Sequence, residues 1–334
     1  MATLTKKDFQ SDVDSRWCPG CGDYAVLNML TAVWAELGIK KENLVVISGI
    51  GCSSRLPYYT DAYGFHTIHG RAPTVALGSK LANPDLDVWV VTGDGDSLSI
   101  GGNHFMHLMR RNPNVKVLLF NNEIYGLTKG QASPTSQSGL KTKSTPFGSI
   151  DQPVKPLSLA LTSGASFVGR IVDAYGPHMK KVLLAAGRHK GVSVVEILTN
   201  CIIFNDKVFN DFEKRDLRQD STVELAEGQP MLYGKNKDKG VILDGLKLKT
   251  VDLNEHPEMK DKVLVHKTNA EGFGMPELLA ASSYPEVPLP IGIFKQVDRP
   301  VYEESVRQQE AMVVEQKGKG DLNKILMSGE TWQV

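Results

Sequence analysis

The first 205 residues alternate between apolar positions at helical spacing and short continuous apolar runs. The segment 24–37 shows the first pattern, because Val26, Leu30 and Val33 fall on one side of a helix and Gly38 follows as a candidate C-cap. The same spacing predicts further helices at 74–84, 103–113 and 177–191, and apolar runs predict strands at 43–51, 86–96, 115–122 and 192–198. Buried strands that alternate with helices favour a parallel sheet covered on both faces.

The pattern weakens after about residue 205. The segment 240–253 is typical of a short hairpin or loop, prolines interrupt the apolar stretch 277–294, and the tail holds one candidate helix before a polar end. We therefore expect a catalytic-type domain over residues 1–205 and an accessory or subunit-docking region over 206–334. The expectation of about two domains agrees with a prior of roughly 150 residues per domain.

Composition narrows the class of protein. Lysine plus arginine and aspartate plus glutamate both number 38, so the formal charge is zero and no electrostatic footprint for nucleic acid or an anionic membrane is expected. The N-terminus lacks the apolar core of a secretory signal, and no apolar run reaches the roughly 18 residues that span a bilayer. With only four cysteines and no signal, we expect a cytoplasmic protein whose cysteines are thiols or metal ligands.

The glycine-rich turn at Gly93, Asp94 and Gly95 follows a predicted buried strand and precedes a helix. Ligands of open α/β sheets bind at that edge, and glycines allow the backbone to approach a phosphate closely. The turn lacks the third glycine of a dinucleotide fingerprint and the Gly-Lys-Ser/Thr of a P-loop. The sequence therefore disfavours a nicotinamide or a nucleoside triphosphate.

A second polar motif, Asn121 and Asn122, ends the next predicted strand. Asp94 and Asn122 are then expected to project from neighbouring strand ends toward one point. Carboxylate and amide oxygens are hard ligands that suit Mg²⁺, which usually shares its coordination sphere with phosphate. The alternative is that each motif is an ordinary turn, but that interpretation is weaker for the pair than for either motif alone.

The cysteines allow three interpretations. Cys18 and Cys21 form a Cys-x-x-Cys motif, Cys52 follows a glycine loop at a strand end, and Cys201 follows the strand at 192–198. A redox dithiol is the weakest interpretation, because no redox-fold strand pattern precedes the motif. Four thiolates suit a structural Zn²⁺ site or an iron–sulfur cluster, and the cysteines alone do not decide between these two.

The motifs together resemble a known family. Gly-Asp-Gly followed by Asn-Asn is similar to the thiamine diphosphate fold of decarboxylases, transketolases and oxoacid oxidoreductases. With "WCPGCG", "GIGCSSRLPYY", "HTIHGRAP", "LLFNNEIYGLTKGQASPTS" and "ILTNCIIFND", residues 16–205 resemble the β subunit of 2-oxoacid:ferredoxin oxidoreductases. The tail resembles, with less specificity, the branch that acts on 2-oxoglutarate.

This resemblance implies a three-layer α/β, thiamine diphosphate-binding fold of the diphosphate-type domain, with an irregular C-terminal extension. It implies Mg²⁺ ligation by the side chains of Asp94 and Asn122 and by the carbonyl of Ile124. It implies one [4Fe–4S] cluster, whose ligands are Cys18, Cys21, Cys52 and Cys201. The cluster is then favoured over zinc, because oxidation of a 2-oxoacid needs an electron acceptor and zinc has no redox chemistry.

The same resemblance suggests the remaining site residues. Arg55 is expected to face the substrate carboxylate, although family members often have lysine at that place, and Lys129 is expected near the substrate. The expected thiamine diphosphate contacts are Gly51, Ser53, His69, Gly93, Gly95, Asp96, Ser97, Gly126 and Leu127. The alternative for several of these residues is that they only order loops.

The function implied is CoA-dependent, reversible oxidative decarboxylation of a 2-oxoacid, with electrons passed through the cluster to ferredoxin. The chain is expected to need an α subunit that supplies the catalytic glutamate, in an assembly of two αβ pairs. The alternatives are a non-oxidative thiamine decarboxylase, which needs no cysteines, and a zinc-stabilised binding subunit without activity. Bound iron and thiamine binding separate these alternatives.

Overall fold

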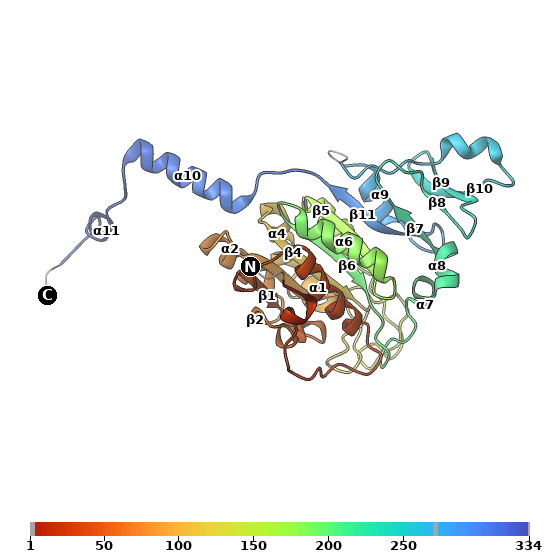
Figure 1. Ribbon diagram of the computed structural model, residues 1–334, viewed down its shortest axis with the longest axis horizontal. Coiled ribbons are helices and arrows are strands. Elements are labelled where there is room, and N and C mark those ends of the chain that lie inside the picture. The colour runs from red at the N-terminus through yellow and green to blue at the C-terminus, as the bar shows by residue number, and fades with distance from the viewer. Residues whose placement is uncertain (1–3, 270–272, 333–334) are drawn as a thin grey trace.

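The computed structural model describes residues 4–269 and 273–332, and its centre is an eight-stranded sheet (Figure 1). In spatial order the strands are β2 (Tyr63–His66), β1 (Leu44–Ser48), β3 (Asp87–Gly93), β4 (Val115–Asn121), β6 (Ser193–Leu198), β5 (Phe167–Val172), β11 (Leu289–Gln296) and β7 (Thr222–Leu225). The first six run parallel, β11 pairs antiparallel with β5, and β7 is parallel to β11.

Helices cover both faces of this sheet, which confirms the predicted three-layer α/β architecture. On one face, side chains of α1 (Asp23–Glu36) and α6 (Gly176–Arg188) pack on the strands in one apolar core. The second core holds side chains of α2 (Ala72–Ala82), α4 (Gly102–Arg111), α5 (Pro156–Thr162) and α9 (Met275–Ala281). Every residue of β4 and β6 is buried, as expected for central strands with helices on both sides.

Within residues 1–205, two strands of the main sheet, β2 and β5, escaped the hydrophobic pattern. The strand β5 carries Arg170 among its apolar residues, so its run is broken although all six residues are buried. The strand β2 lies at the sheet edge and all four of its residues are exposed, so it has no apolar signature. Both strands are held by main-chain pairing with β6 and β1.

The chain after residue 205 contributes to two sheets. The predicted hairpin is present as β9 (Lys239–Asp244) and β10 (Lys247–Asp252), which form a small antiparallel sheet with β8 (Leu232–Tyr233). The strands β7 and β11 instead join the main sheet, and β11 contains the stretch in which prolines weakened the pattern. The division at residue 205 remains a prediction.

The remaining helical segments are short, apart from one. They are η1 (Lys6–Phe9), η2 (Lys41–Asn43), η3 (Ser53–Tyr59), α3 (Asp94–Leu98), α7 (Asn210–Glu213), α8 (Arg215–Ser221), η4 (Pro257–Lys262) and α11 (Leu322–Leu326). The longer helix α10 (Tyr302–Lys317) extends away from the body, with α11 beyond it (Figure 1). Within the described ranges, every helix is too short or too polar to traverse a lipid bilayer.

The parallel strands place the chemistry at one edge of the sheet. The strands β1, β3, β4 and β6 all point the same way, so the loops that follow them meet at their carboxyl ends. Those loops begin near Gly49, Asp94, Asn122 and Thr199. The sequence motifs identified above therefore converge in space.

Candidate functional site

A cavity opens at this edge, between the loops that follow β1, β3 and β4. Its lining includes most of the residues expected to hold the cofactor, namely Gly51, Ser53, His69, Gly93, Asp94, Gly95, Asp96, Asn122, Ile124, Gly126 and Leu127. Ser97 is buried beside the cavity, and its hydroxyl has no hydrogen-bond partner among the described residues. A buried hydroxyl without a partner at this point fits an oxygen-rich ligand.

Asp94 is buried at the floor of the cavity with 3% of its surface exposed. Its Oδ2 atom accepts hydrogen bonds from the hydroxyls of Ser133 and Thr135, each at 2.6 Å. Burial raises the pKa of Asp94, while the two hydroxyls act in the opposite direction. One carboxylate oxygen is thus fixed by protein donors, which orients the group and leaves its other oxygen for a cation.

The second predicted metal-binding segment is held equally firmly. The Asn122 side-chain oxygen accepts from the backbone N–H of Ile124 at 3.2 Å, and the Asn122 carbonyl accepts from the Asn205 side chain at 3.0 Å. Asp94, Asn122 and Ile124 line the same cavity. Hard oxygen donors around one cavity are the set that Mg²⁺ prefers.

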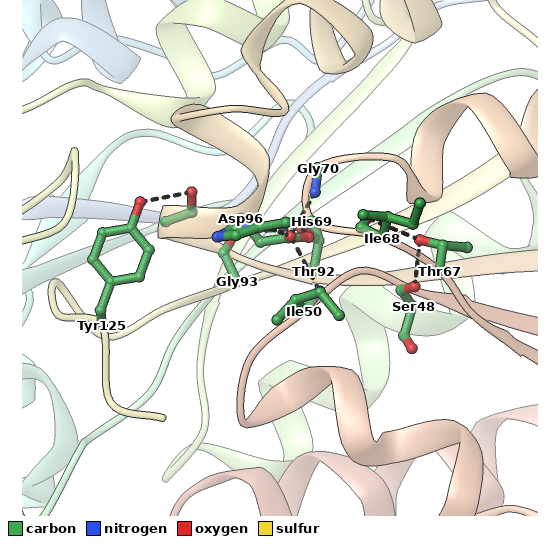
Figure 2. A network of polar contacts seen from close by, with 11 residues as sticks. Ser48, Ile50, Thr67, Ile68, His69, Gly70, Thr92, Gly93, Asp96 and Tyr125 are labelled. Carbon is green, nitrogen blue, oxygen red and sulfur yellow. Dashed lines mark hydrogen bonds and ion pairs between the residues drawn. The ribbon is translucent and has the colours of Figure 1, made fainter. Parts of the chain in front are cut away.

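The side chain of Tyr125 packs against the glycine turn at Gly95. Its hydroxyl donates to the carbonyl of Gly95 at 3.0 Å (Figure 2). A Cβ atom at Gly95 would lie 2.1 Å from the tyrosine ring, so the close approach of the ring requires glycine at this position. At Gly51 the backbone φ of 135° lies in the region that favours glycine.

Asp96 makes the densest set of polar contacts at the site (Figure 2). It accepts hydrogen bonds from the backbone N–H groups of Ile50 and Gly70, from the His69 ring and from the Thr92 hydroxyl. These contacts join two loops, one after β1 and one after β2, to the end of β3. The sequence prediction that Asp96 also contacts a diphosphate stays a prediction.

All four cysteines line a second cavity. The cofactor cavity and the cysteine cavity share a wall made by Asp23, Cys52, Asn122, Gly126 and Leu127. The carbonyl of Cys52 accepts a hydrogen bond from the indole N–H of Trp17 at 2.7 Å. The Cys-x-x-Cys loop and the two distant cysteines are thus brought to one place beside the cofactor cavity.

The backbone at Gly126 lies close to two of the cysteine sulfurs. A Cβ atom at Gly126 would lie 3.4 Å from the Sγ of Cys201 and 3.7 Å from the Sγ of Cys52, so glycine keeps the backbone close to both sulfurs. Across the part of the chain that the structure describes, no three His, Cys, Asp or Glu side chains are close enough to hold one metal ion. Thiolates around a single zinc stand roughly 4 Å apart. A zinc site gains no support from this geometry.

Burial and an acidic neighbour keep two of the thiols, those of Cys21 and Cys52, protonated in the absence of a metal. Burial first, and then the charge of Asp23, raises the pKa of Cys52 to about 12, and the same two causes raise the pKa of Cys21. The pKa of Asp23 itself is raised to about 7 by burial and by Asp173. Cysteine binds metals as the thiolate, so binding of a metal group in this cavity would release protons.

The predicted substrate residues lie differently. Arg55 belongs to η3 and lines the cysteine cavity and a third, shallower cavity together with Ile50, Gly51 and Leu127. Lys129 is exposed in the turn after Gly126, with a left-handed φ of 77°, and is not among the residues that line these three cavities. A substrate role for either residue remains a prediction.

Several residues of the site had no assigned role in the sequence analysis. Ser133 and Thr135 lie in a long irregular loop without periodicity, although that loop belongs to the motif "KGQASPTS". Asp23 begins α1 and Trp17 stands in the motif "WCPGCG", but the sequence analysis assigns a role to neither. Their proximity to the quoted motifs was the only signal that could have found them.

Comparison with known proteins agrees with this geometry. The family model of the thiamine pyrophosphate enzyme C-terminal TPP binding domain matches residues 49–197, which include both the glycine turn and the Asn-Asn motif. The chain is 47% identical to the 2-oxoglutarate oxidoreductase subunit KorB of Mycobacterium tuberculosis, across 98% of this chain and 88% of the relative. It is 46% identical to the 2-oxoglutarate synthase subunit KorB of Archaeoglobus fulgidus, across 65% of this chain and 82% of the relative.

A solved structure is similar over the whole fold. The 2-oxoglutarate:ferredoxin oxidoreductase from Magnetococcus marinus, with 2-oxoglutarate, coenzyme A and succinyl-CoA bound, has a TM-score of 0.77 and 34% identity, and the match covers 99% of this chain and 98% of that one. The thiamine diphosphate-binding fold and the family resemblance are therefore both confirmed. The chain belongs to the family of β subunits of 2-oxoacid:ferredoxin oxidoreductases.

Proposed function

We propose that this chain is the β subunit of a 2-oxoglutarate:ferredoxin oxidoreductase and holds thiamine diphosphate, Mg²⁺ and one [4Fe–4S] cluster. The observation that carries this proposal is the wall shared by the cysteine cavity and the cofactor cavity. A thiamine cofactor needs only the cofactor cavity for simple decarboxylation. A four-cysteine cavity directly beside it suits removal of electrons, which favours the oxidative reaction over the non-oxidative one.

On the cofactor side, Asp94, Asn122 and the Ile124 carbonyl would hold Mg²⁺, and Gly93, Gly95 and Ser97 would line the diphosphate. Ser133 and Thr135 keep the Asp94 carboxylate oriented, and Leu127 forms an apolar wall of the cavity. When bound, thiamine diphosphate supplies the nucleophilic carbon and the electron sink that decarboxylation of a 2-oxoacid requires. The protein supplies orientation and a largely buried, oxygen-rich floor.

On the cluster side, Cys18, Cys21, Cys52 and Cys201 would provide the four thiolates. A [4Fe–4S] cluster at this place supplies a one-electron acceptor between the cofactor and ferredoxin. Gly126 permits the main chain to pass between the two groups without a side chain. Ferredoxin is the proposed final acceptor of the electrons, and a cytoplasmic location is proposed with it.

The substrate assignment rests on the relatives. Two of them are named for 2-oxoglutarate, and the solved relative holds 2-oxoglutarate, coenzyme A and succinyl-CoA. The overall reaction would convert 2-oxoglutarate and CoA to succinyl-CoA and CO₂, with an electron pair passed singly to ferredoxin. Arg55, which lines the third cavity and the cysteine cavity together with Arg16, is the cation proposed to pair with a substrate carboxylate. Lys129 is proposed as a second substrate contact.

A separate α subunit would complete the site. Among the described residues that line the cofactor cavity, the carboxylates are Asp23, Asp94 and Asp96, and none is a glutamate. Glu123 and Glu196 line a different cavity, where Glu123 is held by Gln137 and Glu196 by Arg170. We therefore propose that the glutamate that activates thiamine comes from the partner, in an assembly of two αβ pairs.

Mixing of the subunits tests this function. The chain expressed alone, in preparations shown by mass spectrometry to lack a partner, is expected to bind iron and to show no 2-oxoacid-dependent reduction of ferredoxin or a viologen dye. Addition of the α subunit is expected to restore CoA-dependent reduction, with 2-oxoglutarate preferred over pyruvate. Robust turnover by the chain alone, or a reconstituted complex that decarboxylates 2-oxoglutarate without reducing any acceptor, would contradict the proposal.

A further inference from the structure

Asp96 lies two residues after Asp94 and lines the cofactor cavity, but its carboxylate also accepts hydrogen bonds from groups of the protein. Its Oδ1 atom accepts from the N–H of Ile50 at 3.1 Å, from the N–H of Gly70 at 2.7 Å and from the His69 Nδ1 at 2.5 Å. Its Oδ2 atom accepts from the Thr92 hydroxyl at 2.7 Å. Asp96 is buried, with 2% of its surface exposed. Both oxygens are therefore engaged by protein donors.

The segments that Asp96 joins carry different functions. Ile50 leads through Gly51 to Cys52, a proposed cluster ligand, while His69 lies in the loop between β2 and α2. The end of β3, where Thr92 lies, leads directly to Asp94. One carboxylate thus connects the loop that bears a cluster ligand, the loop that bears a predicted cofactor contact, and the strand end that bears the predicted Mg²⁺ ligand.

The backbone around this carboxylate is shaped to admit it. A Cβ atom at Gly49 would lie 1.7 Å from the Asp96 Oδ2, so the β1 loop passes directly over the carboxylate. Gly70 has a left-handed φ of 73°, and a Cβ atom there would lie 2.5 Å from the backbone nitrogen of Gly101. Two glycines therefore let their loops reach Asp96 at hydrogen-bond distance.

The contact with His69 also determines how that ring can act. A carboxylate only accepts hydrogen bonds, so the Nδ1 of His69 must be the donor in this pair. Nε2 is then the ring nitrogen left for a ligand, and His69 lines the cofactor cavity. The ring also packs edge-on to Tyr125 at a centroid distance of 6.4 Å, which limits its rotation.

We propose that Asp96 is a positioning residue that fixes the Cys52 loop and the His69 loop against the end of β3 and orients the His69 Nε2 toward the cofactor cavity. This inference rests on the proposed function for the identity of the two groups that the loops hold. It revises the expectation that Asp96 contacts the diphosphate, because a carboxylate saturated by protein donors and charged like the diphosphate is poorly suited to that contact.

Hydrogen exchange in the full chain tests the positioning role without any cofactor. In Asp96→Ala, the amides of Ile50 and Gly70 are expected to exchange at least tenfold faster, because each loses a charge-assisted hydrogen bond. Amides within β4 are expected to keep their wild-type rates, which reports that the sheet is intact. In the control Thr92→Val, which removes only the contact to Oδ2, both loop amides should stay protected. Unchanged exchange of Ile50 and Gly70 in Asp96→Ala would overturn the proposal.

A second arm uses Asp96→Asn, which keeps the shape of the side chain, in case the alanine variant folds poorly. Nitrogen NMR of histidine-labelled protein, assigned with His69→Gln, is expected to show the proton on Nδ1 in the wild type and a mixed tautomer in Asp96→Asn. A proton on Nδ1 in both proteins would contradict the role in orienting His69. These shifts would not change if Asp96 served only as packing.

Thiamine diphosphate titrations of the αβ complex separate this inference from the proposed function. Asp96→Asn is expected to weaken binding about tenfold at saturating Mg²⁺. Affinity equal to that of the wild type would refute the coupling to the cofactor cavity. If the wild-type complex itself binds no thiamine diphosphate, the proposed function fails, while the exchange and NMR arms still decide whether Asp96 holds the loops.

Discussion

Removal of the hydroxyls that hold Asp94 is expected to weaken cofactor binding although neither hydroxyl is a metal ligand. Ser133 and Thr135 each donate to the same Asp94 oxygen at 2.6 Å in a buried environment. Both hydroxyls favour the charged form of a carboxylate whose pKa burial raises. Loss of one such outer partner typically costs 10- to 100-fold in metal affinity, or about 1.4–2.7 kcal/mol.

The structure also predicts how the two losses combine. After Ser133→Ala, the Thr135 hydroxyl still lies 2.9 Å from the Asn121 Oδ1, and after Thr135→Val, the Ser133 hydroxyl still lies 3.3 Å from that of Ser136, so the hydroxyl that remains keeps another partner. The fold should therefore survive each change. Because both hydroxyls act on one carboxylate oxygen, the double variant should lose less affinity than the sum of the single losses.

The assay is calorimetric titration of the αβ complex with thiamine diphosphate at saturating Mg²⁺, followed by titration of Mg²⁺ at saturating cofactor. Ser138→Ala is the matched control, because Ser138 is exposed in the same loop and donates to the carbonyl of Asp151. Asp94→Ala should abolish measurable Mg²⁺-dependent binding. The prediction is wrong if the Ser133→Ala and Thr135→Val variants bind thiamine diphosphate and Mg²⁺ as tightly as Ser138→Ala while Asp94→Ala does not bind them. The two hydroxyls would then not be needed to orient the Asp94 carboxylate.

Three further predictions follow from other parts of the molecule. Cys201→Ser should lose or convert the cluster while Asp94→Ala retains it, and a full [4Fe–4S] spectrum in Cys201→Ser would argue against the ligand assignment. Arg170→Met leaves the buried Glu196 carboxylate without its 2.7 Å partner and should lower the free energy of unfolding in urea by about 3–5 kcal/mol; a loss under about 1 kcal/mol would contradict this. Burial and the charge of Lys116 lower the pKa of His189 to about 4, so the unfolded chain binds more protons between about pH 4 and 6.5. The contribution of His189 to stability should therefore fall as the pH drops through that window, by about 2 kcal/mol at pH 5 relative to pH 8, and His189→Gln should remove this contribution from the profile measured in thermal melts.

The hydrophobic pattern was sufficient for most of the central sheet, and the reasons for its failures are physical. Continuous apolar runs revealed β1, β3, β4 and β6 because both faces of those strands are covered. The strand β5 was missed because the side chain of Arg170 is neutralised by Glu196, a partner that only the fold brings near. The strand β11 was obscured by prolines and glycine, yet it pairs with β5 in the main sheet.

The candidate site, like the sheet, was predicted only in part from the sequence. The positions of Asp94 and Asn122 at the ends of neighbouring predicted strands were enough to suggest that these residues lie close together. The cofactor and cluster assignments came from the family resemblance. The roles of Ser133 and Thr135 could not be predicted, because an irregular loop has no periodicity that reports where its hydroxyls lie. Asp96 was associated with the diphosphate from its position in the glycine turn, whereas only the folded structure reveals its four protein donors.

Electron paramagnetic resonance of the anaerobically purified αβ complex tests the central claim most directly. The account predicts an oxidised, silent cluster that gives a reduced [4Fe–4S] signal when 2-oxoglutarate and CoA are added, and no signal when thiamine diphosphate is omitted or when Cys201→Ser replaces the wild-type chain. Iron that stays oxidised after 2-oxoglutarate and CoA are added to the complete complex, or a preparation that contains zinc in place of iron, would contradict it.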